Sequence, residues 1–495
     1  MKDNPVKNVV IAGGGTAGWM ACAALAKLVG KSINITLVES DEIGTVGVGE
    51  ATIPPIRTFH KLLGINEQEF MKATQASFKL GIQFEHWGQK NTDYIHSFGM
   101  TGKECWAGEF HHFWLQSLEK GLNSDFGDYC YELQAAKAGK FGFSQQNPIN
   151  YAYHLDATLY AKYLRGFAEK LGINRIEGKI TKVTKQSDNG NIQALELASG
   201  QIIEGDFFID CTGFIGLLIE KTLHTGYENW SHLLPCDSAI AVQTKAEGEQ
   251  VTPYTRSVAH DSGWQWRIPL QHRVGNGLVY CSQYMSDNEA KTLIEENISG
   301  EKITEPRVIK FTPGRRLKGC NKNCLALGLA SGFIEPLEST SIHLIMSGVI
   351  RFLRLFPFNG IQQNAIDEYN KQLKGELENI RDFIILHYNV TQRTDSEFWQ
   401  HCRSIDIPAT LRHKIDLFEK TGRVFLDDGD IFRVDSWTQV MLGQGIMPQQ
   451  FHLIADMMND DELQRFLSGI KTSIAQRLQQ LPEHHTFIER YCKSD

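Results

Sequence analysis

The sequence lacks several features that would place it in common protein classes. It has no run of about 18 uninterrupted apolar residues, so we expect no transmembrane helix. Its ten cysteines are scattered, and the closest pair, Cys320 and Cys324, lacks the spacing of a zinc or redox motif, which predicts reduced thiols. The net charge is −8 and no basic stripe is present, so nucleic acid is not expected as a partner.

The sequence also shows no pattern of a metal site or a targeting signal. The adjacent pairs His111/His112 and His484/His485 are expected to point apart on a regular element, so we predict no metal site. The short apolar run at 9–12 ends at three glycines, too early for a signal peptide. We therefore expect retention in the cytoplasm.

The N-terminal segment carries the pattern of a dinucleotide-binding site. A β-rich run at 9–12 precedes the turn GGGTAG, and an apolar, helix-prone stretch follows at 19–29. Glycine permits the tight turn and the close approach of backbone to a pyrophosphate, whose charge the helix N-terminus favours. A second strand at 33–38 ends at an acidic residue placed to hold a ribose hydroxyl. The predicted contacts are Gly13, Gly15, Thr16, Ala17, Gly18 and Glu39.

Two later segments favour FAD over NAD as the dinucleotide. FFIDCTGF at 207–214 and CLALGLASG at 324–332 each read as a buried strand that runs into glycine. A chain that returns to its nucleotide module after long insertions is typical of large flavoproteins, and the last glycine turn then lies beside the flavin. A glycine turn without any ligand is the alternative for each motif.

The overall pattern predicts an α/β protein with a Rossmann-like FAD-binding module of the flavin monooxygenase type and a mainly helical C-terminal subdomain. The length predicts two or three closely packed units, with no internal repeat or low-complexity tract. We assign 1–345 to the module, with aromatic-rich substrate insertions at about 93–160, which include Phe98 and Trp106, and 346–495 to a helical subdomain that covers the substrate site.

Four further segments narrow the interpretation. GVGEATIP at 47–54, FKLG at 78–81, WQWRIP at 264–269 and GFIEPLEST at 332–340 occur in this order along the chain. Each resembles a motif of the tryptophan-halogenase family of flavin-dependent enzymes. The resemblance implies FAD contacts at Gly49, Glu50, Ala51, Gly328, Ser331 and Gly332. It also implies a catalytic lysine, Lys79, and a catalytic glutamate, Glu338.

Lys79 lies in a stretch from Ser77 to Phe84 in which apolar and polar residues alternate, as in a half-buried strand. The pattern alone favours a solvated lysine. The resemblance implies instead that Lys79 lines an internal tunnel and either hydrogen-bonds hypohalous acid or forms a haloamine.

Glu338 to Ser341 are predicted to form a helix N-terminus, because an apolar run with helical spacing follows Pro336. Free backbone N–H groups there favour an anion, and the resemblance implies a halide at Thr340 and Ser341. Ordinary capping by Ser339 or Thr340 is the alternative. The best-known relatives have glycine where this chain has Ser341, which leaves the preference between chloride and bromide open.

The tryptophan pair of WQWRIP projects to one face if the segment is a strand. Core packing is one interpretation of such large side chains. The resemblance implies another, in which the segment keeps organic substrate away from the flavin. The residues concerned are Trp264, Trp266, Ile268 and Pro269.

Together these features predict an enzyme that uses FADH₂, O₂ and a halide to chlorinate or brominate an electron-rich aromatic, such as indole, an indole derivative or tryptophan. No second glycine fingerprint suggests a nicotinamide site, so a separate flavin reductase is the expected partner. The oligomeric state stays open, a homodimer included. The alternatives are a single-component FAD-dependent aromatic hydroxylase and a non-enzymatic flavin-binding protein.

Overall fold

The computed structural model describes residues 5–44, 49–105, 108–122, 124–144, 148–246 and 251–494. Gly47, Val48 and Trp106 lie outside the described residues. The chain forms two compact units of three segments each. Unit 1 contains Met1–Gln75, Leu155–Ser231 and Phe311–Glu378, and unit 2 contains Ala76–His154, His232–Lys310 and Asn379–Asp495.

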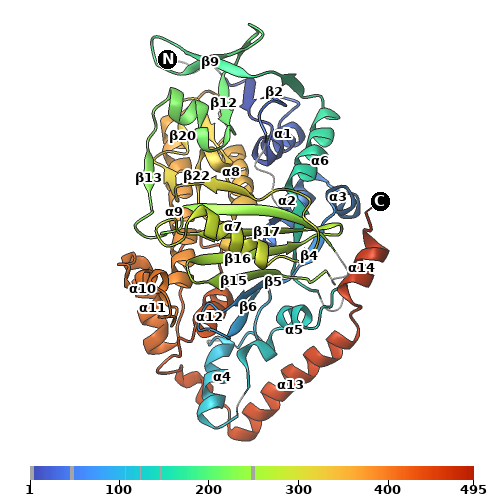
Figure 1. Ribbon diagram of the computed structural model, residues 1–495, viewed down its shortest axis with the longest axis vertical. Coiled ribbons are helices and arrows are strands. Elements are labelled where there is room, and N and C mark those ends of the chain that lie inside the picture. Colours follow the sequence, from blue (N-terminus) through green and yellow to red (C-terminus); the bar gives the residue numbers. More distant parts are fainter. Residues whose placement is uncertain are drawn as a thin grey trace. The chain divides into compact units, whose positions relative to one another are not determined.

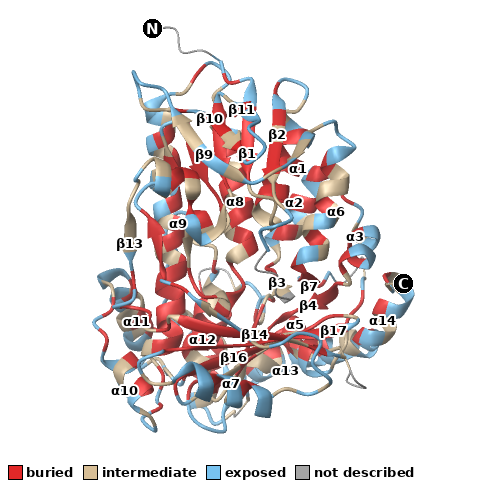
Figure 2. Cartoon of the chain, turned by 45° about the horizontal axis from the view of Figure 1, so that its top comes forward, coloured by how far each residue is buried: buried red, intermediate tan, exposed pale blue. Residues whose placement is uncertain are grey.

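Unit 1 is built on a six-stranded sheet with the order β20-β21-β12-β1-β2-β8. All neighbours pair in parallel except β20, which is antiparallel to β21. The central strands are apolar and buried, as expected for a parallel sheet covered on both faces (Figure 2). The bounds are β1 Asn8–Ala12, β2 Asn34–Glu39, β8 Asn174–Glu177, β12 Phe207–Asp210, β20 Cys320–Asn321 and β21 Cys324–Ala326.

The helix α1 (Thr16–Leu28) follows the first strand directly and packs against α6 (Ala157–Glu169) and α8 (Ser341–Arg354) (Figure 1). Residues 18–26 of α1 are all buried, and its many alanines and glycine allow close packing on several sides. This strand, glycine turn and helix confirm the predicted Rossmann-like start of the chain. The other helices wholly within unit 1 are α2 Pro55–Leu63 and α3 Glu67–Thr74.

Smaller elements complete unit 1. The strands β9 (Ile180–Lys185), β10 (Ile192–Leu197) and β11 (Ile202–Glu204) form an antiparallel meander. A second small sheet has the order β13-β19-β22. The remaining bounds are β3 Gly49–Ala51, β13 Tyr227–Asn229, β19 Gly314–Arg316 and β22 Gly332–Phe333, the 3₁₀ turns η2 Gly213–Ile215, η4 Gly328–Ala330 and η5 Pro336–Glu338, and the π-helix η3 Leu217–Thr222.

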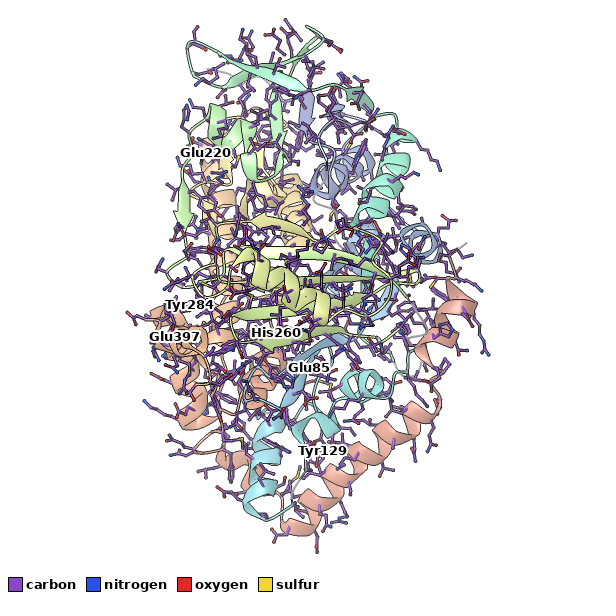
Figure 3. The ribbon with its side chains drawn as sticks, in the orientation of Figure 1. Glu85, Tyr129, Glu220, His260, Tyr284 and Glu397 are labelled. Carbon is purple, nitrogen blue, oxygen red and sulfur yellow. The ribbon has the colours of Figure 1, made fainter. Side chains whose placement is uncertain are left out.

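Unit 2 contains a seven-stranded, mainly antiparallel sheet with the order β18-β14-β17-β16-β15-β5-β6. Its one parallel pair joins β15 to β5. Glu85 of β5, which Figure 3 labels, accepts hydrogen bonds from Nε and Nη2 of Arg256 at 2.6 and 2.8 Å. The bounds are β5 Gly81–Glu85, β6 Asp93–Ser97, β14 Ser238–Lys245, β15 Thr255–His260, β16 Gly263–Pro269, β17 Arg273–Tyr280 and β18 Arg307–Lys310.

The strand predicted from Ser77 to Phe84 is wrong in one respect, because it is two strands. The first, β4 (Ser77–Lys79), pairs with β7 (Ala152–Asp156), and the second is β5. The break falls at Leu80, whose N–H donates to Pro253 while its carbonyl accepts from Phe98. The chain thus changes partner without losing its backbone hydrogen bonds.

Helices dominate the C-terminal part, as predicted. The described residues from 346 onward contain helices and no strand. Among the described helices, none is both long enough and apolar enough to cross a membrane. The bounds are α9 Gln363–Asn389, α10 Glu397–Ser404, α11 Ala409–Thr421, α12 Val434–Gly443, α13 Asp460–Gln479, α14 His484–Tyr491 and the 3₁₀ turn η6 Leu453–Met457; earlier in unit 2 lie α4 Phe110–Glu119, η1 Phe126–Tyr129, α5 Tyr131–Lys137 and α7 Asp287–Glu296.

The compact units have other boundaries than the domains that we predicted from the sequence. The predicted boundary after residue 345 falls inside α8, and the last of the boundaries between the compact units falls inside α9. Each unit is discontinuous, so no single boundary in the sequence separates them. The functional division into an FAD module and a covering subdomain stays a prediction.

One buried carboxylate in unit 1 anchors α8 to the middle of α9. Glu376 accepts from Arg351 at 2.7 Å and from Ser347 at 2.9 Å, and it lies 3.2 Å from His343 Nε2. Burial alone would raise the pKa of the Glu376 carboxyl, but the hydrogen bond and charge of His343, together with Arg351, leave this pKa lowered. These partners are spaced four residues apart, so one face of α8 meets a single anion.

We predict that Glu376→Ala destabilises the protein by roughly 3–5 kcal/mol at neutral pH, because Arg351 is left buried without its anion. The lowered pKa means that the stabilisation is fully present above the ordinary glutamate value of about 4.3 and is lost as the pH falls through the folded-state value. Urea unfolding followed by circular dichroism at several pH values measures this. Asp367→Ala, at an exposed site on the same helix, is the control. Equal stability of the two variants would refute the anchoring role.

Candidate functional site

Three parallel strands of unit 1 end level with one another and bring their following turns together. Ala12 lies opposite Asp210, and Asp210 lies opposite Ala326. The turn after β1 begins at Gly13, whose φ is +106° and where a Cβ would come within 2.4 Å of the Cys211 carbonyl oxygen. Ligands of open α/β sheets bind at this carboxyl edge. Only glycine fits the backbone at this point.

The glycine turn at 13–18 and the glycine segment at 324–332 meet at the start of α1. A Cβ at Gly328 would lie 2.9 Å from the Cβ of Ala17, so the turn after β21 contacts the first turn of the helix. The N-cap of α1 is Gly15, which offers no side chain, and no acidic residue occupies the first turn. The helix N-terminus therefore keeps the backbone N–H groups and positive dipole that suit a phosphate.

Glu39 lies against the same glycine turn, at the end of β2. A Cβ at Gly14 would overlap its carboxylate, at 1.5 Å from Oε2. Trp19 Nε1 donates to Oε2 at 3.2 Å, and Arg175 Nε donates to Oε1. The carboxylate is thus held against the glycine turn by neighbours on both oxygens, and its contact with a ribose stays a prediction.

Two arginines at this edge were missed by the sequence analysis. Arg175 pairs with Glu39, and Arg165 Nη1 lies 3.5 Å from the same carboxylate. Both lie more than 120 residues from Glu39 in the sequence, Arg165 on α6 and Arg175 on β8. No local pattern could have found them, because strand pairing between β2 and β8 creates the contact.

The segment resembling the flavin-contacting loop forms the short strand β3, of which Gly49, Glu50 and Ala51 are described. Burial raises the pKa of the Glu50 carboxyl to about 7. This group is thus partly protonated near neutral pH and can donate as well as accept a hydrogen bond. Its contact with FAD stays a prediction.

The predicted helix N-terminus after Pro336 is present as a short 3₁₀ turn followed by α8. Glu338 ends that turn with a side chain 1% exposed, and Ser339 has a left-handed φ of +60°. The N-cap of α8 is Thr340, whose side chain makes no capping hydrogen bond and whose buried Oγ1 has no partner among the described residues. Capping by Thr340 is therefore excluded, and the first turn from Ser341 can offer its N–H groups to an anion.

Lys79 in unit 2 is fully buried, which excludes the solvated lysine that the pattern favoured. Its ammonium lies 5.2 Å from the centre of the Phe98 ring, which belongs to the predicted aromatic-rich insertion. Such a contact stabilises a cation away from water. The structure thus gives Lys79 an aromatic neighbour, and β4 fixes its direction through pairing with Ala152.

A chain of hydrogen bonds supports the strand that carries Lys79. Ser77 Oγ donates to the Pro269 carbonyl at 2.7 Å and lies 3.2 Å from His154 Nδ1. His154 Nε2 in turn lies 2.9 Å from Thr255 Oγ1. Burial, followed by the charge of Lys79, lowers the pKa of His154 well below its usual value. His154 is therefore a neutral imidazole that positions β4 without competing with Lys79 for charge.

The tryptophan pair lies on β16, and its two rings share one face with centroids 6.0 Å apart. The Trp266 ring covers Gly277, where a Cβ would come within 1.9 Å of it. Ile268 and Pro269 are buried on the same strand. Both tryptophans are buried, in accord with core packing, and their role in separating substrate from flavin stays a prediction.

One geometric expectation about the histidines is wrong. The rings of His111 and His112 do not point apart, because they converge at the start of α4 with centroids 4.2 Å apart. With Glu109 they form a group that could hold a metal ion. However, His112 Nδ1 accepts from the His452 N–H, which places the proton of a neutral ring on Nε2, 3.5 Å from Glu109. That proton blocks the nitrogen that faces Glu109, so the absence of a metal stays our prediction.

The catalytic residues predicted from the sequence fall in different units. The cofactor candidates, Glu338, Thr340 and Ser341 belong to unit 1, whereas Lys79 and the tryptophan pair belong to unit 2. Within unit 1 the structure brings 13–18, Glu39 and Gly328 to one edge of the sheet. The joint action of Lys79 and Glu338 stays a prediction.

Comparison with known proteins identifies the family. The tryptophan halogenase family model matches residues 8–460. Tryptophan 6-halogenase ThaL from Streptomyces albogriseolus is 33% identical over 90% of this chain and 91% of its own length. Two solved structures resemble the chain over 99% of both partners: Xcc4156, a flavin-dependent halogenase from Xanthomonas campestris (54% identity, TM-score 0.98), and BrvH, a flavin-dependent halogenase from Brevundimonas sp. BAL3 (42% identity, TM-score 0.95).

These likenesses extend over nearly the whole chain and include both compact units. They agree with the motifs of the sequence and with the glycine edge of unit 1. The chain belongs to the tryptophan halogenase family and is a flavin-dependent halogenase.

Proposed function

We propose that this enzyme uses FADH₂ and O₂ to chlorinate or brominate an electron-rich aromatic substrate, namely indole, an indole derivative or tryptophan. The observation that carries the proposal is the complete burial of Lys79 beside an aromatic ring. A buried ammonium is costly in a protein and is retained where it serves chemistry. The family supports the halogenation itself, and the substrate and residue roles are our proposal.

The residues at the carboxyl edge of unit 1 fit FAD. The backbone cradle at Gly13 excludes a Cβ, and the uncapped α1 N-terminus suits a pyrophosphate. Glu39 would hold the ribose hydroxyls, while Gly49, Glu50, Ala51, Ser331 and Gly332 would contact the flavin. When bound in reduced form, FAD supplies the two electrons with which O₂ and a halide give hypohalous acid and water.

The halide would rest on the first turn of α8. Thr340 and Ser341 provide backbone N–H groups, and the Thr340 hydroxyl, which has no partner among the described residues, adds a donor. No charged side chain is needed, because the helix dipole already favours an anion. Ser341 adds a hydroxyl that a glycine would lack, so it is the residue through which halide preference is expected to be set.

Lys79 would direct the electrophilic halogen at one ring carbon. The O–X bond of HOX breaks as the halogen is transferred as X⁺ and the carbon–halogen bond forms. The ring then loses H⁺, and the hydroxide left from HOX takes up a proton to become water. Glu338 would stabilise the cationic ring before that proton leaves. Selectivity then depends on how the substrate is held relative to one lysine. A lysine haloamine and hydrogen-bonded HOX remain alternative forms of the active species.

The cofactor site gives a first test. Gly13→Ala places a Cβ against the Cys211 carbonyl and should weaken FAD binding at least tenfold, because the turn must open to relieve the clash. Gly200→Ala is the control, because Gly200 lies at an exposed turn with φ +84° and no atom lies near its Cβ. This variant should lose only about 1 kcal/mol of folding stability, from the left-handed backbone, and should bind FAD normally. Flavin fluorescence titration measures the affinities. Tenfold weaker binding in both variants, or in neither, would contradict the assigned site.

The lysine gives a second test. Lys79→Met keeps the length and apolar stem but removes the amine, and halogenated product should fall by at least ~100-fold while FAD binding stays normal. The assay is mass spectrometry of an indole panel incubated with FAD, a flavin reductase, NADH, O₂ and either bromide or chloride. Lys72→Met, at an exposed site, is the control. Product that carries oxygen without halogen would favour the hydroxylase alternative.

The source of electrons gives a third test. Since we identified no second glycine fingerprint for a nicotinamide, NADH alone should leave the flavin of the oxidised holoenzyme unreduced for many minutes under anaerobic conditions. Added flavin reductase should bleach the flavin absorbance within the same period. Rapid bleaching by NADH without reductase would show that the chain itself binds and oxidises nicotinamide.

A further inference from the structure

A pocket of about 500 Å³ lies wholly within unit 2, among α5, the C-terminal end of α13 and α14 (Figure 1). It is of the size that small-molecule sites usually have, about 300–1,000 Å³. The side chains that define its chemistry are four aromatic residues and two arginines: Tyr131, Phe143, Phe487, Tyr491, Arg477 and Arg490. None of them belongs to the halogenase motifs described above.

The aromatic side of the pocket is a set of rings that already pack edge to face. Phe143 meets Phe487 at 5.2 Å and 87°, and it meets Tyr491 at 5.1 Å and 80°. Phe143 is nevertheless 44% exposed, which is unusual for so large an apolar side chain beside other rings. Exposed, offset rings of this kind offer a planar ligand the edge or face contacts that aromatic groups prefer.

The arginines of the pocket form no ion pair with the described residues. Neither Arg477 nor Arg490 forms an ion pair with any described residue, and the half-buried Arg477 has a hydrogen-bond donor, Nε, without an acceptor. Arg477 instead lies over the Tyr131 ring, 3.6 Å from its centre. Among the described residues, the pocket therefore contains two guanidinium groups with no carboxylate paired to them. They leave this pocket complementary to an anion.

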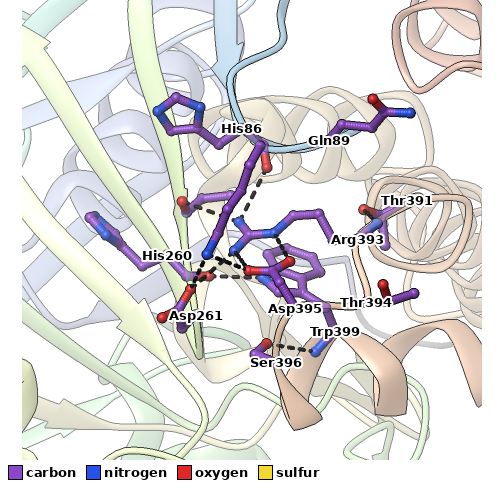
Figure 4. Close-up of polar contacts among 12 residues, drawn as sticks. His86, Gln89, His260, Asp261, Thr391, Arg393, Thr394, Asp395, Ser396 and Trp399 are labelled. Carbon is purple, nitrogen blue, oxygen red and sulfur yellow. Dashed lines mark hydrogen bonds and ion pairs between the residues drawn. The ribbon is translucent and has the colours of Figure 1, made fainter.

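Arg393, elsewhere in unit 2, shows the usual state of a buried arginine (Figure 4). It donates to both oxygens of Asp395 at 2.9 and 2.8 Å, and it lies 3.2 Å from Asp261. Arg477 interacts electrostatically with an acidic group, Glu132. Glu132 already accepts a hydrogen bond from the Asn150 N–H, and burial raises its pKa. Glu132 therefore compensates Arg477 only weakly.

The pocket is on the opposite side of β4 from Lys79. Phe78 packs on the pocket rings, at 5.8 Å from Phe143 and 5.6 Å from Phe487. Successive side chains of a strand project to opposite faces, and Lys79 accordingly faces Phe98. A molecule in the pocket is thus separated from the proposed halogen-transferring amine by the strand itself.

We propose that this pocket is a second binding site, which takes a planar aromatic carboxylate. The ring of the ligand packs on Phe143 and Phe487, and its carboxylate bonds to Arg477 and Arg490. The site binds its ligand without halogenating it, because β4 stands between the ligand and Lys79. This inference does not depend on which substrate the enzyme halogenates.

The test uses indole-3-acetate as the probe and isothermal titration calorimetry of the FAD-loaded enzyme. We expect Arg477→Gln and Arg490→Gln each to weaken its binding about tenfold, as for a lost hydrogen bond to a charged group. Arg465→Gln, at an exposed site of α13, should bind as the unaltered enzyme does. Indole, which lacks the carboxylate, and acetate, which lacks the ring, should each bind at least tenfold more weakly than the probe.

Halogenation of indole by the same variants is the independent measurement. It should stay within about twofold of the unaltered enzyme, because neither arginine faces Lys79. Probe affinity that is unchanged in both variants would overturn the proposal, since the probe then binds elsewhere. Loss of halogenation together with binding would overturn the claim of a separate site. Arg490 lies on an exposed position of α14, so its variant remains informative even if Arg477→Gln fails to fold.

Discussion

The carboxyl edge of the unit 1 sheet depends on one contact, the close approach of the Gly13 backbone to the Cys211 carbonyl. It exists because β1, β12 and β21 run parallel and end level, so the turns that follow them must share a very small space. A side chain at Gly13 would separate those turns. The absence of a Cβ at Gly13, and again at Gly328 beside Ala17, lets α1 begin where a pyrophosphate can reach its N–H groups.

Charge is managed differently in the two compact units. In unit 1 the partly buried Glu39 and the buried Glu376 each have several partners, and these contacts tie β2 and α8 to their neighbours. In unit 2 the buried cation Lys79 lies beside an aromatic ring, and the neutral His154 supports its strand. A fully bonded buried anion stabilises a fold, and the ring beside Lys79 stabilises its positive charge.

Much of the fold could be predicted because its signals are local. The strand, glycine turn and helix at the N-terminus, the acidic end of β2, the helix start after Pro336 and the one-sided tryptophan pair all follow from residue spacing. The errors arose where a distant segment intervened. Leu80 exchanges strand partners between Pro253 and Phe98, and the rings of His111 and His112 converge because the backbones of Gly422 and His452 bind them.

The sequence by itself determined the family motifs, the glycine positions and the order of elements, because each depends on the sterics of a few neighbouring residues. Only the tertiary structure decided that Lys79 is buried, that Arg175 meets Glu39, and that Arg477 and Arg490 line one pocket with a cluster of rings. Burial and charge pairing depend on residues from different elements, as for Arg175 and Glu39, which are 136 positions apart. No pattern within a strand or helix specifies which of them will meet.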